Sequence, residues 1–99
     1  MTRDEAVARL RSIEPELRAF GVEHLYLFGS VARNEAHGRS DLDVFVEPAD
    51  KDFLRFDNFM GPFALIEEAF PETPIGYSTR NGLSVYVRGA AEREAVRVF

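Results

Sequence analysis

The sequence predicts one small α/β domain, in which a small mixed β-sheet is flanked by helices. Stretches with a helical spacing of apolar residues alternate with short runs of strand-forming residues, which is typical of α/β folds. The chain has 99 residues, of which 45% are hydrophobic, enough for one core but not for a second substrate domain. Residues 1–99 are therefore expected to form a single domain.

The first predicted element is a helix over residues 2–20, where apolar residues recur every three or four positions. Thr2 followed by Glu5 matches a capping box, which predicts the start of this helix. Gly21 predicts its end. Pro15 lies inside the stretch and predicts a kink or a split.

Two strands should follow, separated by a short helix. Residues 24–28 are rich in strand formers and end at Gly29. Residues 30–34 tolerate a helix that begins directly after this glycine. Residues 41–46 predict the second strand, which Pro48 ends.

The second half continues the alternation. Residues 53–70 have helical spacing, and the pair Gly61-Pro62 predicts a break or bend within them. A third strand is expected over residues 75–79. The remaining segments are residues 83–87, which fit a strand or a helix, a helix over 90–94, and an extended end over 95–99.

Composition and charge exclude several classes of protein. The chain has no cysteine, which rules out a disulfide framework and a cysteine-based zinc site. No segment approaches the roughly 20 apolar residues of a membrane span, and the charged N-terminus does not resemble a signal peptide. We therefore expect a cytoplasmic protein. The net charge of −5 and the scattered basic residues disfavour a nucleic-acid partner, although a metal ion could still bridge the acidic protein to a nucleotide.

One pair of residues suggests a phosphate site. Gly29, between a strand and a helix, lets the backbone approach a ligand closely. Amide groups at the start of a helix favour an anion, and Ser30 adds a hydroxyl at the same place. A Gly-Ser pair alone is usually only a turn.

A second pair suggests a metal site. Asp41 and Asp43 are two apart on a predicted strand, so their side chains should leave the same face, with their Cα atoms about 6.6 Å apart. Carboxylates this close repel each other unless a cation lies between them, and Mg²⁺ suits a site with few protein carboxylates. The same spacing also occurs on the solvated face of ordinary strands, so the prediction depends on both pairs together.

The combined pattern, Gly-Ser followed by ten residues and Asp-x-Asp, resembles the signature of the DNA polymerase beta nucleotidyltransferase superfamily. Ala32, Arg33 and Ser40 further match its minimal, MNT-type branch, whose members are about this short. The resemblance covers nearly the whole chain and implies a polymerase-beta-like nucleotidyltransferase fold. Arg33 could instead make a surface ion pair, and Ser40 could simply cap a turn.

The resemblance implies a role for each matching residue. Asp41 and Asp43 would ligate Mg²⁺ and act as catalytic residues, with ATP as the nucleotide substrate. The nucleotide-binding residues would be Gly29, Ser30, Arg33 and Ser40. Proteins of this branch are commonly antitoxins of HEPN-domain toxins, and some transfer AMP from ATP onto a toxin tyrosine. A HEPN-like protein partner is therefore expected, while a homo-oligomer stays open.

The chain departs from this family at one position. Members usually carry a third carboxylate on the next strand, where this sequence has Gly76. Loss of a general base lowers rates by about 10²–10⁴, so two hypotheses stay open: an AMP-transferring enzyme, or a catalytically weakened binding module that neutralises its partner by complex formation. Glu47, Asp57 and Glu72 are alternative sources of the missing acid.

Overall fold

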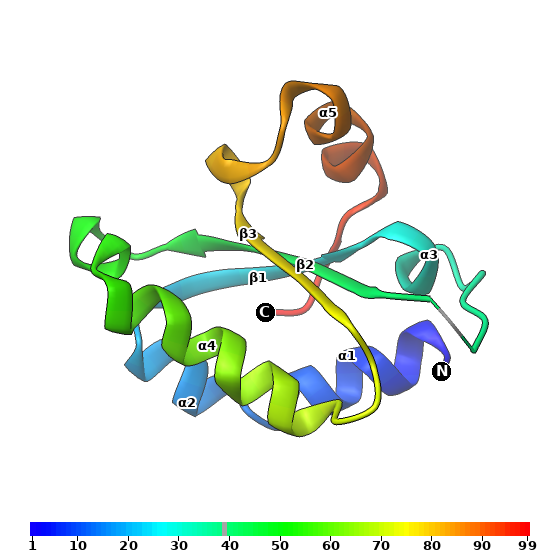
Figure 1. The fold of residues 1–99 in the computed structure, drawn as a ribbon, viewed down its shortest axis with the longest axis horizontal. Coiled ribbons are helices and arrows are strands. Elements are labelled where there is room, and N and C mark those ends of the chain that lie inside the picture. Colours follow the sequence, from blue (N-terminus) through cyan, green and yellow to red (C-terminus); the bar gives the residue numbers. More distant parts are fainter. Residues whose placement is uncertain (39) are drawn as a thin grey trace.

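The computed structural model describes residues 1–38 and 40–99, and Figure 1 shows the arrangement of its elements. In chain order these are α1 (Arg3–Arg11), α2 (Glu14–Ala19), β1 (Val22–Phe28), α3 (Gly29–Ala32), β2 (Leu42–Pro48), the 3₁₀ turn η1 (Lys51–Leu54), α4 (Phe56–Ala69), β3 (Ile75–Thr79), the 3₁₀ turn η2 (Arg80–Gly82), α5 (Val85–Glu94) and β4 (Val96–Arg97).

The strands form one mixed sheet in the order β3-β2-β1-β4. Strand β2 pairs antiparallel with β1 and parallel with β3, while β4 pairs antiparallel with β1. Helices α1, α2 and α4 lie against one face of this sheet, and α5 lies on the other side (Figure 1). The predicted α/β class and mixed sheet are confirmed.

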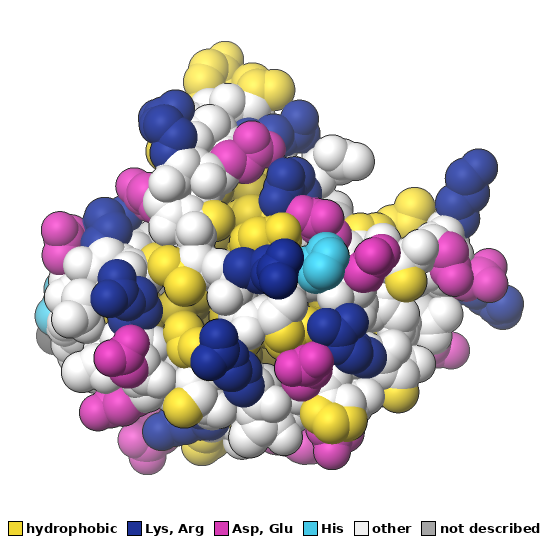
Figure 2. All heavy atoms as spheres, turned by 180° about the vertical axis from the view of Figure 1, so that it is seen from behind, with side chains coloured by type: hydrophobic (Ala, Val, Ile, Leu, Met, Phe, Trp, Pro, Cys, Tyr) yellow, Lys and Arg dark blue, Asp and Glu magenta, His cyan; other side chains and the backbone are white. Residues whose placement is uncertain are grey.

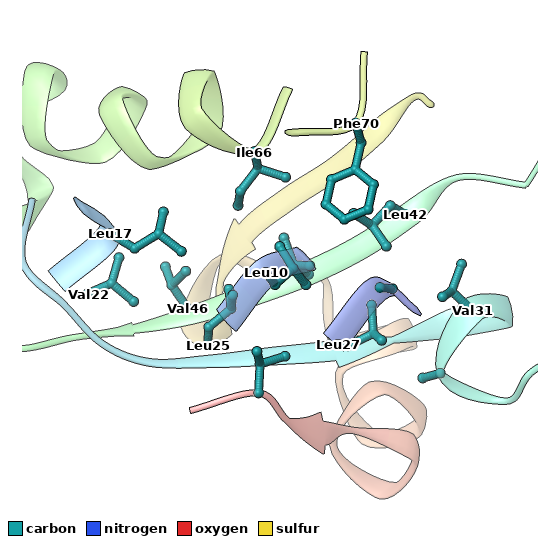
Figure 3. Close-up of a cluster of buried hydrophobic side chains, with 14 of the residues drawn as sticks. Leu10, Leu17, Val22, Leu25, Leu27, Val31, Leu42, Val46, Ile66 and Phe70 are labelled. Atoms are coloured by element: carbon teal, nitrogen blue, oxygen red, sulfur yellow. The ribbon is translucent and has the colours of Figure 1, made fainter. Parts of the chain in front are cut away.

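Alternate residues of the two central strands build the core under α1, α2 and α4. In the register of these strands Leu27 lies opposite Val44, and Leu25 opposite Val46. Figure 3 shows the side chains of Leu25, Leu27 and Val46 together with those of the helices. The side chains that it labels are all buried, and they are Leu10, Leu17, Val22, Leu25, Leu27, Val31, Leu42, Val46, Ile66 and Phe70. Because strand side chains alternate between faces, Asp43, Phe45 and Glu47 of β2 point to the opposite face.

The N-terminal signals act as predicted. The Thr2 hydroxyl accepts a hydrogen bond from the Glu5 amide at 3.1 Å, and the Glu5 carboxylate accepts one from the Thr2 amide at 3.3 Å. Pro15 lies in the first turn of α2 and so marks a split rather than a kink. Gly21 follows α2 with φ +104°, a left-handed conformation that favours glycine.

Of the break or bend predicted at Gly61-Pro62, the break is wrong, because α4 runs through both residues; the bend stays a prediction. The packing explains why: Gly61 lies directly against the ring of Phe20, and a Cβ atom at this position would collide with that ring. Pro62 is buried in the same helix. We infer that the stabilisation from tertiary contacts exceeds the cost of the helix hydrogen bond that proline cannot donate.

Three smaller boundaries also differ from the prediction. Residues 51–54 form η1, so the long helix starts at Phe56 rather than at Phe53. Residues 85–87 belong to α5, which resolves the ambiguous segment as a helix. Asp41 lies one residue before β2 instead of on it.

The described residues contain no helix long and apolar enough to cross a lipid bilayer. On the face seen in Figure 2, basic and acidic side chains are interspersed, with apolar side chains between them. Non-specific nucleic-acid binding needs basic groups that neutralise phosphates.

Candidate functional site

The site begins where β1 turns into α3. Gly29 is the first residue of this one-turn helix and has φ +77°, which L side chains rarely adopt. The residue before it, Phe28, pairs with Asp43 across β1 and β2. This pairing sets the start of α3 beside the Asp43 side chain.

The carboxylate of Asp43 lies between two glycines. A Cβ atom at Gly29 would collide with Oδ2 of Asp43 and lie 3.2 Å from its Cγ. On the other side, a Cβ atom at Gly76 would lie 2.5 Å from Oδ1. Gly76 is the residue opposite Asp43 in the parallel pairing of β2 with β3. Both glycines therefore leave the room that this carboxylate occupies.

The two acids repel each other. Burial raises the pKa of Asp43 above its ordinary value, the nearby Asp41 carboxylate raises it further, and the Arg33 guanidinium lowers it. Asp41 itself is exposed. A cation between the two carboxylates would relieve this repulsion, and their oxygen atoms suit Mg²⁺, which needs few protein ligands. The two residues that the sequence predicted as metal ligands therefore interact electrostatically, and their joint binding of a metal stays a prediction.

Among residues 1–38 and 40–99, no group of three or more His, Cys, Asp or Glu side chains gathers in a metal-binding arrangement. Of the three alternative acids, Glu47 pairs with Arg80 at 2.6 Å. Asp57 is exposed in the first turn of α4, and Glu72 is exposed in the segment after that helix. The described residues therefore offer no third carboxylate beside Asp41 and Asp43.

Arg33 makes the surface ion pairs that the sequence left as an alternative. Its Nε lies 3.0 Å from Oε2 of Glu35, and its Nη1 lies 2.9 Å from Oε2 of Glu94. The second pair ties α3 to the last turn of α5. No spacing pattern could have identified Glu94, because the contact joins residues 61 positions apart.

The two serines differ in position. Ser30 lies in α3 directly after Gly29 and is half-buried. Ser40 caps a turn, because its hydroxyl accepts a hydrogen bond from the His37 amide at 2.9 Å. Ser40 also lines a cleft with Glu72 and Thr73. The structure therefore brings Ser30 to the glycine turn and engages Ser40 in its own loop.

A larger cleft of about 370 Å³ lies elsewhere, and neither acid of the pair lines it. Its lining residues are Glu47, Pro48, Leu54, Thr79, Arg80 and Asn81. The Arg80 guanidinium there lies over the rings of Tyr26 and Phe45, 5.1 and 5.2 Å from their centroids. The glycine turn and the acid pair, which carry the predicted chemistry, are the better candidate despite their open position.

Comparisons with known proteins identify the family and the fold. The family described as the nucleotidyltransferase domain matches residues 10–97. A solved structure assigned as a minimal nucleotidyltransferase is 25% identical, with 97% of this chain and 95% of that chain covered and a TM-score of 0.78. No significant match to a characterised protein was found by sequence.

Two further solved structures share the fold at lower identity. A toxin–antitoxin with AMP-PNP is 18% identical, with a TM-score of 0.66, and covers 100% of this chain and 73% of that chain. A mutant of the toxin–antitoxin MntA-HpeT, with two Asp-to-Glu substitutions two positions apart, is 16% identical, with a TM-score of 0.64 and the same coverage. The match over residues 10–97 spans most of the sequence, and this chain therefore belongs to the nucleotidyltransferase domain family.

Proposed function

We propose that this protein binds a nucleoside triphosphate with Mg²⁺ and transfers AMP from ATP to a hydroxyl group of a HEPN-type toxin, for which it is the antitoxin. The observation that carries the proposal is the contact between Asp43 and Gly29. It supports a shared metal and phosphate site, because one acid of the pair lies beside the glycine turn.

The residues of the site would divide the work. Gly29 leaves space for a phosphate group, and Ser30 offers a hydroxyl donor beside it. Asp41 and Asp43 would hold Mg²⁺, which when bound neutralises charge on the phosphates. The single turn of α3 is short, so its dipole contributes less than a long helix would.

The transfer itself exchanges one bond for another. The acceptor hydroxyl oxygen forms a bond to the α-phosphorus of ATP, the bond from that phosphorus to pyrophosphate breaks, and the hydroxyl proton goes to solvent. Arg33 could support the triphosphate by exchanging its ion pairs with Glu35 and Glu94 for phosphate oxygens.

The related structures support this proposal. A toxin–antitoxin of the same fold was solved with AMP-PNP, an analogue of ATP. The MntA-HpeT mutant carries substitutions of two aspartates at the spacing that separates Asp41 from Asp43. Both observations suggest a nucleotide and a protein partner for this chain as well.

A second function is favoured by Gly76. This glycine stands opposite Asp43 in the sheet, where the family usually has a third acid, and the described residues supply no substitute. Without a base, transfer would be slower by about 10²–10⁴. The protein would then neutralise its partner by forming a complex, with the nucleotide bound but not transferred.

Calorimetry tests the shared part of both functions. We expect ATP to bind in Mg²⁺ and not in a chelator, and we expect this binding to be lost in Asp41→Asn/Asp43→Asn. Asp52→Asn, on the exposed turn η1, is the matched control and should bind like the wild type. If the wild type shows no magnesium-dependent binding, both versions fail.

Label transfer separates the two functions. The protein is incubated with Mg²⁺, α-labelled ATP and the protein encoded beside it. Label that appears on that protein, and disappears with the double Asn variant, supports the enzyme. Full neutralisation of the partner by the double Asn variant supports the binding module and contradicts a transfer-dependent antitoxin.

A further inference from the structure

We propose that Gly76 is a spacer that gives its side-chain space to the Asp43 carboxylate, so that the site holds one divalent ion instead of two. This inference rests on the proposed metal and nucleotide site. Under this inference the site requires glycine at position 76, whereas the resemblance to the family implies only that an acid is missing there.

The first argument is steric. The residues Asp43 and Gly76 lie opposite each other in β2 and β3. A Cβ atom at Gly76 would lie 2.5 Å from Oδ1 of Asp43 and 3.6 Å from its Cγ, and real Cβ atoms are essentially never as close as the first distance. Any side chain at this position would therefore have to displace the carboxylate.

The second argument is that the carboxylate has little room to move away. Its other oxygen, Oδ2, faces Gly29, where a Cβ atom would also collide with it. The like charge of Asp41 opposes movement towards that residue. The carboxylate thus lies between the β3 backbone at Gly76 and the start of α3 at Gly29, with the negative charge of Asp41 nearby.

The third argument concerns ligands. Two-metal sites hold their ions about 3.5–4 Å apart and need donors for both. The described residues provide only the pair of carboxylates, since Glu47 is held by Arg80. The next side chain on this face of β3, Ser78, donates its hydroxyl to the Thr79 carbonyl at 2.7 Å. Two carboxylates suit one Mg²⁺ that takes its other ligands from phosphate and water.

Four proteins test the inference: the wild type, Gly76→Ala, Gly76→Asp and Gly38→Ala. A Cβ atom at Gly38 would meet nothing within 4 Å, so this variant is a matched glycine-to-alanine control. Each protein is titrated with Mn²⁺ in the presence of AMP-PNP, and electron paramagnetic resonance counts the bound ions.

We expect one Mn²⁺ per wild-type chain. Gly76→Ala should weaken Mn²⁺ binding by about 10–100-fold, as changes behind metal ligands commonly do, and Gly38→Ala should not. Gly76→Asp should also bind more weakly and hold no second ion, because its Cβ meets the same oxygen. Gly76→Ala with wild-type affinity, or Gly76→Asp with two ions at wild-type affinity, would overturn the inference.

Unfolding experiments provide a readout without any ligand. Gly76→Ala is introduced into the wild type and into Asp43→Ala, which lacks the atoms that the new Cβ would meet. If the spacer role is correct, Gly76→Ala destabilises the first protein more than the second. Equal effects in both backgrounds contradict it. A wild type that binds no Mn²⁺ would instead remove the proposed function together with this inference.

Discussion

The two faces of the sheet use the same strand in different ways. Leu42, Val44 and Val46 of β2 are fully buried against helices, whereas Asp43, between them in sequence, faces two glycines on the other side. The helix-covered face is filled with side chains. On the other face Phe45 is also fully buried, but the position of Asp43 depends on two glycines that have no side chain. The comparison teaches that neighbouring residues of one strand can serve different purposes: Leu42 and Val44 stabilise the fold, and Asp43 between them belongs to the candidate site.

The largest expected effect is on the filled face. Leu42→Ala removes a fully buried side chain and should lower the free energy of unfolding by about 2–5 kcal/mol. Urea denaturation measures this change. Asp43→Asn, the next residue, should keep or raise stability, because it removes a charge that burial and Asp41 disfavour. A loss of stability in Asp43→Asn as large as in Leu42→Ala would break the comparison.

A smaller loss is expected at the glycine turn. Gly29→Ala forces an alanine into φ +77°, which costs about 1–2 kcal/mol, and its Cβ would also press against Asp43. Both unfolding and magnesium-dependent ATP binding should therefore weaken. Gly38→Ala serves again as the control. Unchanged ATP binding in a folded Gly29→Ala protein would show that the turn does not contact the phosphates.

The filled face also holds a titratable group. The Tyr77 hydroxyl donates a hydrogen bond to the Phe59 carbonyl at 2.7 Å, so Tyr77→Phe should lower the free energy of unfolding by about 0.5–1.5 kcal/mol near neutral pH.

Alkaline pH should reduce this difference. Burial raises the pKa of Tyr77 above its ordinary value, so the folded state keeps its proton where the unfolded chain loses it. This contribution is fully present below about pH 10 and falls as the pH rises further. Tyr77→Phe lacks it, and the stability gap measured by urea should narrow above pH 10. A gap that stays constant there would show that the hydroxyl is not buried in solution.

The smallest effect is expected at the ion pair between Arg33, which follows α3, and Glu94 of α5. Glu94→Gln removes one partner of Arg33 and should leave the unfolding curve nearly unchanged, because exposed ion pairs are weak. If Arg33 turns to the triphosphate, ATP affinity should rise by less than about fivefold. Weaker ATP binding, measured by calorimetry, would show that Arg33 needs Glu94 for its position.

Local signals predicted much of the fold. The capping box at Thr2 and the glycine at position 21 both depend on neighbouring residues, and the structure confirms them. The break at Gly61-Pro62 was predicted wrongly because a distant ring, that of Phe20, packs against the glycine. Local propensity carries no information about such a contact.

In the candidate site, too, local features were predictable from the sequence and contacts between distant residues were not. The sequence identifies Gly29 and the acid pair by type and spacing, but their convergence depends on the register of β1 with β2. The environment of Arg33 depends on Glu94, which lies on a helix far along the chain. The space left by Gly76 depends on the pairing of β2 with β3. The sequence shows that an acid is missing at position 76, but it does not show that the Asp43 carboxylate lies in the space of that side chain.

Paramagnetic NMR tests the central claim most directly. Mn²⁺ is added in small amounts to the labelled protein with AMP-PNP, and the broadening of each backbone amide is followed. The account predicts that Gly29, Ser30, Asp43 and Gly76 broaden first, while the amides of α4 stay sharp. Broadening centred on Arg80 and Asn81 instead, with the glycine turn unaffected, would contradict it.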